Sequence, residues 1–175
     1  MDVTLLSKNS IKIKGKKASF IFSPAHDIQK NAADAVILFS NEVADLSRVD
    51  EYRVIISEAG EYEVGGAKIN GTKAGSGTVY VLVIDGIDIL VGRTSDISSA
   101  ADKNQEHQVA VLMADSEIKE SIITAIEPRL TILYGEKTEE AVKALGKEKA
   151  EVEVTKKISF TEDKLPEEMG VAVLS

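Results

Sequence analysis

The chain has 175 residues, 43% of them hydrophobic and 29% charged, which is typical of a globular protein and suits a single domain over residues 1–175. A net charge of -8 makes nucleic acid an unfavourable partner, because such a surface repels a phosphate backbone. The absence of cysteine excludes disulfides and thiolate nucleophiles, and no apolar run is long enough to span a bilayer. We therefore expect a cytoplasmic protein that binds no membrane.

Strand patterns fill the start of the chain. Residues 2–23 alternate apolar and polar side chains, most clearly where Lys12 separates Ile11 from Ile13, and this period of two predicts an antiparallel meander. Residues 27–34 have weak helical character. The first elements are therefore expected to be a small sheet followed by a short helical segment.

An apolar run at residues 36–39 is expected to organise the rest of the chain. Consecutive apolar residues bounded by polar ones are typical of a strand buried on both faces. In α/β proteins, functional groups gather just after such a strand. The segment that follows, residues 40–47, holds no histidine or cysteine and only two carboxylates. The position of this segment therefore suggests a functional site, but its residues are not those of a typical catalytic or metal-binding site.

Hairpins are predicted in the middle of the chain. Gly65-Gly66 and Asp85-Gly86 are favoured tight turns between apolar strands. Residues 72–77 have the composition of a flexible loop. The strands predicted here cover residues 53–56, 60–64, 67–69, 79–84 and 87–91.

Strands and helices alternate in the second half. An apolar stripe predicts a helix over residues 116–126 with its N-cap at Asp115 or Ser116, and a second helix over residues 138–145 ends at Gly146. The remaining predicted strands cover residues 109–113, 130–134, 151–154, 157–160 and 171–174. This alternation predicts parallel strands joined by right-handed crossovers.

Short motifs follow one another in a characteristic order and spacing. They are DVTLL with IKIKG, ADAVILFS, GEYEV, VYVL with DGI, IEPRL, and LPEE with VAVL. With these motifs the chain resembles the metallo-β-lactamase superfamily, in particular its small zinc-dependent hydrolases related to ascorbate-phosphate lactonases. The resemblance runs nearly end to end. It implies an α/β fold, a four-layer αββα sandwich of two mixed sheets flanked by helices, with the site at the mouth between the sheets.

The resemblance also implies a metal-binding motif directly after residues 36–39, a serine followed by H-x-H-x-D-H. Ser40 matches the serine and Asp45 matches the aspartate of this motif. The three histidine positions are instead occupied by Asn41, Val43 and Leu46. Valine and leucine have no lone pairs with which to bind a metal.

Two further metal-ligand positions of the family are also altered. Arg93 stands where an aspartate bridges two metals, and the last histidine falls near Tyr134 or Gly135. An arginine places a fixed positive charge where cations should bind. We hypothesise that Arg93 forms a salt bridge with Asp45 in place of the metal.

A residual polar site is the remaining possibility for metal chemistry. It would combine His26 with carboxylates from Asp27, Asp45 and Asp96, whereas His107 precedes a strand elsewhere. Both histidines are interpreted as ordinary surface or hydrogen-bonding residues.

These departures predict a metallo-β-lactamase-like domain that has lost metal binding and hydrolase activity. We expect no catalytic residues and no cofactor, and a role as a binding or assembly module for a protein or small molecule whose identity the sequence does not reveal. One alternative is a hydrolase with a divalent metal at the displaced carboxylate and histidine site. Another is a structural subunit of a homo-oligomer.

Overall fold

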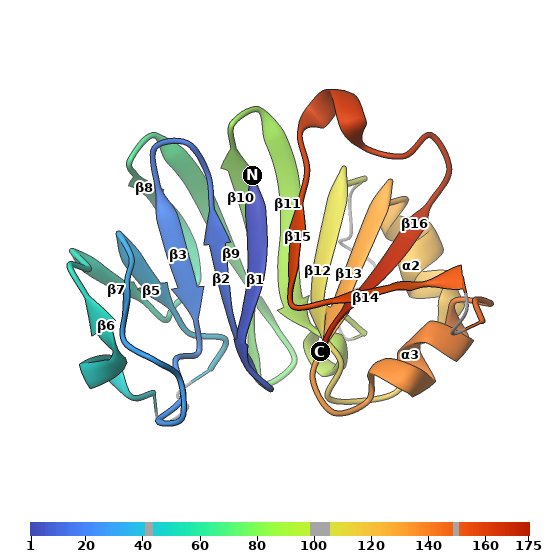
Figure 1. Ribbon diagram of the computed structural model, residues 1–175, viewed down its shortest axis with the longest axis horizontal. Helices are drawn as coiled ribbons and strands as arrows, with labels where there is room; N and C mark the ends of the chain where they lie inside the picture. The colour runs from blue at the N-terminus through green and yellow to red at the C-terminus, as the bar shows by residue number, and fades with distance from the viewer. Residues whose placement is uncertain (41–43, 99–105, 149–150) are drawn as a thin grey trace.

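Two large β-sheets make up most of the fold in the computed structural model, which describes residues 1–40, 44–98, 106–148 and 151–175 (Figure 1). The six-stranded sheet has the order β15-β1-β2-β3-β5-β7. Its strands are β1 (Asp2–Ser7), β2 (Ser10–Lys14), β3 (Ser19–Phe22), β5 (Ala35–Ile37), β7 (Val54–Ile56) and β15 (Lys157–Ser159). The strands from β15 to β3 are antiparallel, and β3, β5 and β7 are parallel. The predicted meander and the strand after it are confirmed.

The second sheet has eight strands in the order β14-β16-β13-β12-β11-β10-β9-β8. They are β8 (Gly60–Val64), β9 (Ala67–Ala74), β10 (Gly77–Ile84), β11 (Ile87–Arg93), β12 (Val109–Met113), β13 (Leu130–Tyr134), β14 (Glu153–Thr155) and β16 (Gly170–Leu174). Strands β8 to β11 form antiparallel hairpins, and β11, β12, β13, β16 and β14 are parallel. The predicted change from hairpins to parallel strands is confirmed.

The main core lies between the inner faces of the two sheets. Fully buried aromatic rings from both sheets meet there: Phe22 stacks on Phe39 with ring centroids 5.5 Å apart, and Phe39 lies 6.4 Å from Tyr80. Stacked aromatic rings bury large apolar areas, so this cluster holds the sheets together near the end of β5.

The longer α-helices of the described ranges cover the outer face of the eight-stranded sheet. α2 (Glu120–Ile126) and α3 (Thr138–Ala144) pack on the eight-stranded sheet, and a short α1 (Thr94–Ile97) follows β11 (Figure 1). The outer face of the six-stranded sheet is covered by β4 (Asn31–Ala32), β6 (Val49–Asp50) and a 3-10 helix at Leu46–Arg48, which pack on an apolar cluster of their own. A fourth layer of helices is therefore not confirmed in the described ranges.

Three local predictions are wrong, each because a tertiary contact overrides a local pattern. Residues 27–34 form no helix but contain β4, which pairs in parallel with β6. Residues 72–77 are largely strand, because β9 and β10 pair up to a two-residue turn in which Ala74 faces Gly77. Neither Asp115 nor Ser116 caps α2, which begins at Glu120 after Lys119.

None of the described helices is both long and apolar enough to cross a membrane.

Candidate functional site

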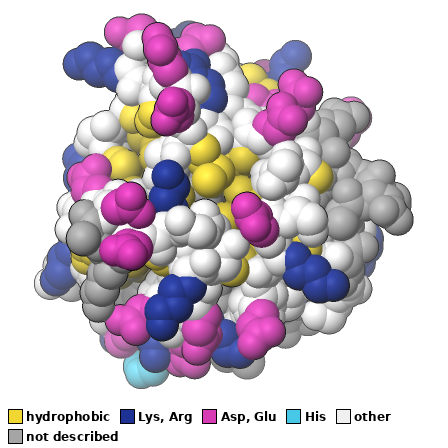
Figure 2. All heavy atoms as spheres, turned by 90° about the vertical axis from the view of Figure 1, so that its right-hand side faces the viewer, with side chains coloured by type: hydrophobic (Ala, Val, Ile, Leu, Met, Phe, Trp, Pro, Cys, Tyr) yellow, Lys and Arg dark blue, Asp and Glu magenta, His cyan; other side chains and the backbone are white. Residues whose placement is uncertain are grey.

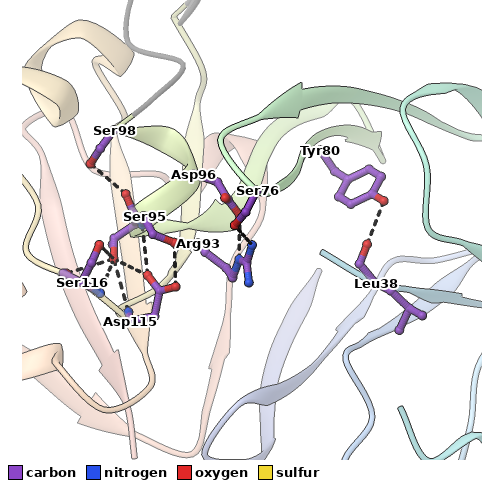
Figure 3. A network of polar contacts seen from close by, with 10 residues as sticks. Leu38, Ser76, Tyr80, Arg93, Ser95, Asp96, Ser98, Asp115 and Ser116 are labelled. Carbon is purple, nitrogen blue, oxygen red and sulfur yellow. Dashed lines mark hydrogen bonds and ion pairs between the residues drawn. The ribbon is translucent and has the colours of Figure 1, made fainter. Parts of the chain in front are cut away.

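The candidate site lies where several strands end together. Arg93, Met113 and Tyr134 are the last residues of β11, β12 and β13, and the sheet register aligns Arg93 with Met113 and Met113 with Tyr134. Because the strands are parallel, the segments that follow them meet at one edge of the sheet. Polar side chains from these segments form the network in Figure 3.

A buried ion pair is the main feature of this network. The Nε atom of Arg93 donates to Oδ2 of Asp96 at 2.6 Å, and the two side chains are only 12% and 1% exposed. Arg93 also donates from Nη2 to Oγ of Ser76 at 3.2 Å, in the turn between β9 and β10 (Figure 3). A buried charge is tolerated when a partner compensates it, so Asp96 and Arg93 depend on each other.

Gly77 allows this close packing. A Cβ atom at that position would lie 2.5 Å from Oδ2 of Asp96 and 2.6 Å from both Nη2 of Arg93 and the carbonyl oxygen of Phe39. The backbone N–H of Thr78 donates to that same carbonyl oxygen at 2.7 Å. Only glycine therefore lets the start of β10 lie against both the ion pair and the end of β5.

A second set of hydrogen bonds surrounds Asp115, which follows β12. Ser95 donates to its carboxylate from the backbone N–H at 3.0 Å and from Oγ at 2.7 Å, and Thr94 donates from Oγ1 at 2.9 Å. Burial raises the pKa of Asp115, but these hydrogen bonds and the nearby charge of Arg93 outweigh it and lower that pKa below its ordinary value. Asp115 is therefore a carboxylate at neutral pH.

The two sheets are also joined directly at this end of the molecule. The hydroxyl of Tyr80 in β10 donates to the carbonyl oxygen of Leu38, just after β5, at 2.9 Å (Figure 3). Burial raises the pKa of Tyr80, so the phenol stays protonated and remains a donor. This hydrogen bond links the two sheets just before the segment in which the resemblance implies the metal-binding motif.

The structure gives Asp45 and Arg93 different partners, so the hypothesised salt bridge between them is wrong. Asp45 accepts hydrogen bonds from Ser47, which lower its pKa, and lies 3.7 Å from Arg48. Arg93 reaches Asp96 instead because Asp96 is only three positions further along the chain, at the end of β11. A salt bridge between Arg93 and Asp96 forms within one short segment, so it does not require the segment that holds Asp45 to move toward Arg93.

The other substituted ligand positions have structural roles where they are described. Leu46 packs into the apolar cluster on the outer face of the six-stranded sheet. Gly135 has a φ angle of 106°, and a Cβ there would lie 3.1 Å from the carbonyl oxygen of Ala114. Asn41 and Val43 lie outside the described residues.

The alternative polar site is not assembled among these side chains. His26 and Asp27 are exposed, and His26 lies close enough to Asp45 for its charge to contribute to the lowered pKa of that carboxyl. Asp96 is instead buried against Arg93. His107 lies near the opposite ends of the strands, where its Nδ1 is 2.5 Å from Oδ1 of Asp88.

The described residues at the implied ligand positions do not fit a catalytic metal. Such a site needs about three imidazole or carboxylate ligands with one position open to water. Leu46, Arg93 and Gly135 offer no suitable donor at the implied positions. Within the described ranges, no group of three or more histidine, aspartate and glutamate side chains could hold a metal ion.

Sequence reasoning missed most of the network. Thr94, Ser95 and Asp115 were not predicted as site residues, and Asp115 was assigned to a helix cap. The available signal was the polar run that begins at Arg93, directly after an apolar strand. A local pattern cannot show that this run meets Asp115 across the sheet.

Comparison with known proteins supports the fold. No family model matches the sequence, and no curated protein matches it. The structure is similar to that of a proposed zinc-dependent hydrolase of the metallo-β-lactamase superfamily from Thermotoga maritima, with 17% identity, coverage of 99% of this chain and 97% of that chain, and a TM-score of 0.76.

Two other solved structures are similar to this chain over nearly their whole length. A proposed metal-dependent hydrolase from Parabacteroides distasonis is 12% identical over 99% of this chain and 93% of that chain, with a TM-score of 0.63. An isothiocyanate hydrolase from Delia radicum gut bacteria is 10% identical over 98% of this chain and 96% of that chain, with a TM-score of 0.56. The chain therefore has the metallo-β-lactamase fold. The ligand set that its described residues offer is consistent with a degenerate metal centre.

Proposed function

We propose that this protein is a metallo-β-lactamase-fold domain that has lost its metal centre and hydrolase activity and serves as a binding or assembly module. The observation that carries the proposal is the Arg93 to Asp96 ion pair, buried at the position where the resemblance implies a metal-bridging aspartate. A guanidinium there repels divalent cations and occupies the nearest buried carboxylate.

The surrounding groups support the same proposal. Asp115, the next carboxylate along this edge, already accepts three hydrogen bonds from Ser95 and Thr94. Metal binding would have to break these bonds and displace the Arg93 side chain. An ordered polar network of this kind stabilises the end of the sheet without any catalytic step.

Elemental analysis tests the loss of metal. The purified protein is incubated with zinc, manganese or iron(II), dialysed, and analysed together with a variant that restores the motif, Asn41→His, Val43→His, Leu46→His and Arg93→Asp. We expect metal well below one ion per chain in the natural protein and more in the restored variant, with circular dichroism as the check on folding. Stoichiometric metal in the natural protein would contradict the proposal.

The alternative, a displaced divalent-metal site, is supported by the backbone hydrogen bond from Asp45 N–H to the carbonyl oxygen of Pro24 at 2.8 Å, which brings the loop that carries His26 beside Asp45. If it were correct, the natural protein would bind metal, and a His26→Ala, Asp45→Asn variant would lose it. Gln29→Ala, an exposed residue of the same loop that is not part of the alternative site, is the matched control. If the natural protein binds no metal, this alternative is rejected and the proposal of a domain without a metal centre stands.

A further inference from the structure

An apolar groove lies between α3 and β14 at the end of the eight-stranded sheet. Its volume is about 510 Å³, and its apolar wall is formed by Val142, Val152, Val154 and Val173. Figure 2 looks onto this side of the molecule and shows hydrophobic side chains gathered in a hollow among basic and acidic ones. Val154 is 53% exposed, compared with 39% for Val83 on β10. The apolar surface under α3 therefore continues, uncovered, to the edge of the sheet.

The backbone of β14 is available for pairing. β14 is the last strand of the sheet and has β16 on one side only. The backbone N–H of Ser175 donates to the carbonyl oxygen of Thr155 at 3.1 Å, so the polar groups of Thr155 face β16. Because successive residues of a strand direct these groups to opposite sides, the N–H and C=O of Val154 face the free edge.

The charges around the groove are mixed. Its rim carries two acidic side chains, Glu139 and Glu148, and two basic ones, Lys143 and Lys147. A rim that carries both signs does not build up the net repulsion that would keep a rotated copy of the same surface away. A single-sign rim would repel its own copy.

We propose that β14 pairs antiparallel with β14 of a second copy of this chain, about a two-fold axis at Val154. In an antiparallel hydrogen-bonded pair the two facing residues exchange both backbone bonds, so Val154 would satisfy the free groups of Val154 in the other copy. The two side chains then lie on the same face and close both grooves. This inference deepens the assembly role proposed above and rests on it.

A second copy explains these features better than an unrelated peptide does. β14 has only three residues, so a peptide added to it gains few backbone bonds. The two-fold arrangement adds the apolar contact between the two Val154 side chains and the two grooves. Because β14 is so short, the association should be weak and concentration-dependent.

Sedimentation equilibrium across micromolar to submillimolar concentrations of the full chain tests the proposal. We expect a reversible dimer whose dissociation constant rises at least about tenfold in Val154→Glu, because two carboxylates would then meet on the axis. Val154→Pro removes the exchanged N–H without adding charge, is tolerated on a free strand edge, and should have the same effect. Val83→Glu, an exposed valine outside the groove, is the matched control and should leave the dimer unchanged.

Charge reversal identifies the partner as a second copy. A variant with Lys143→Glu and Lys147→Glu and a variant with Glu139→Lys and Glu148→Lys should each dimerise less than the natural chain, and their mixture should form heterodimers preferentially.

A concentration-independent monomer, or a dimer insensitive to both Val154 variants, would overturn the inference. So would a monomer in which the methyl NMR signals of Val154 and Val173 shift on addition of decanoate, which would assign the groove to a small amphiphile. Each of these results could occur with or without bound metal. The experiments on dimerisation and the measurement of metal content therefore test the two proposals independently.

Discussion

Replacing Asp96 by asparagine removes the buried carboxylate that pairs with Arg93 without changing the shape of the side chain. Asp96 is 1% exposed, Arg93 is 12% exposed, and the atoms that join them are 2.6 Å apart. Removing one partner of a buried ion pair costs about 3–5 kcal/mol, because the other charge is left uncompensated. We expect a cost near 3 kcal/mol for Asp96→Asn, since the amide oxygen still accepts a hydrogen bond from the guanidinium.

Urea unfolding followed by circular dichroism measures this cost, and a double-mutant cycle separates the pair from its surroundings. Arg93→Met alone should be at least as destabilising, because it leaves the carboxylate buried, whereas Arg93→Met with Asp96→Asn should cost clearly less than the sum of the two. Asp50→Asn is the control: its pair with Lys30 is exposed and should contribute less than about 1 kcal/mol. A cost below about 1 kcal/mol for Asp96→Asn, or additive single effects, would refute the role of the ion pair.

Three further predictions follow from the same edge of the sheet. Gly77→Ala should destabilise the protein by about 1–3 kcal/mol, because its Cβ would lie 2.6 Å from the Phe39 carbonyl oxygen, and urea unfolding unchanged from the natural chain would contradict this. Gly135→His should lower stability by about 1–3 kcal/mol through the positive φ angle and should bring no zinc binding by elemental analysis; a stable variant that takes up zinc would be the opposing result. The lowered pKa of Asp115 means that its hydrogen bonds stabilise the fold above the ordinary aspartate pKa and that this contribution is lost as pH falls through the folded-state value. Ser95→Ala should therefore cost about 1.5–3 kcal/mol at pH 7, and the difference should shrink below about pH 4 in urea unfolding; a difference independent of pH would oppose the assignment.

Much of the fold could be predicted from local sequence. Asp85-Gly86 marks a tight turn, and the alternation around Ile11 gives a strand in the expected place. The apolar run at residues 36–39 also gives a strand, although β5 spans Ala35–Ile37 and ends before Leu38. These signals work because side-chain period and turn chemistry act over a few residues.

For the site, the sequence predicted which metal ligands are missing but not which contacts replace them. The substitutions at Leu46 and Arg93 indicated a lost metal centre, but the partner of Arg93 was assigned incorrectly. The sequence also gave no sign that Asp115 would bind Ser95 rather than cap α2. Such contacts depend on the alignment of β11 with β12, and residues about twenty apart in sequence cannot be matched by periodicity alone.

The zinc content of the dialysed natural protein tests the central claim most directly. Because Arg93 pairs with Asp96 and Asp115 already accepts three hydrogen bonds, we predict zinc far below one ion per chain, and the same low value in Asp96→Asn, which leaves the guanidinium in place. Stoichiometric zinc that survives dialysis would contradict the account and show that a working metal centre exists in this fold.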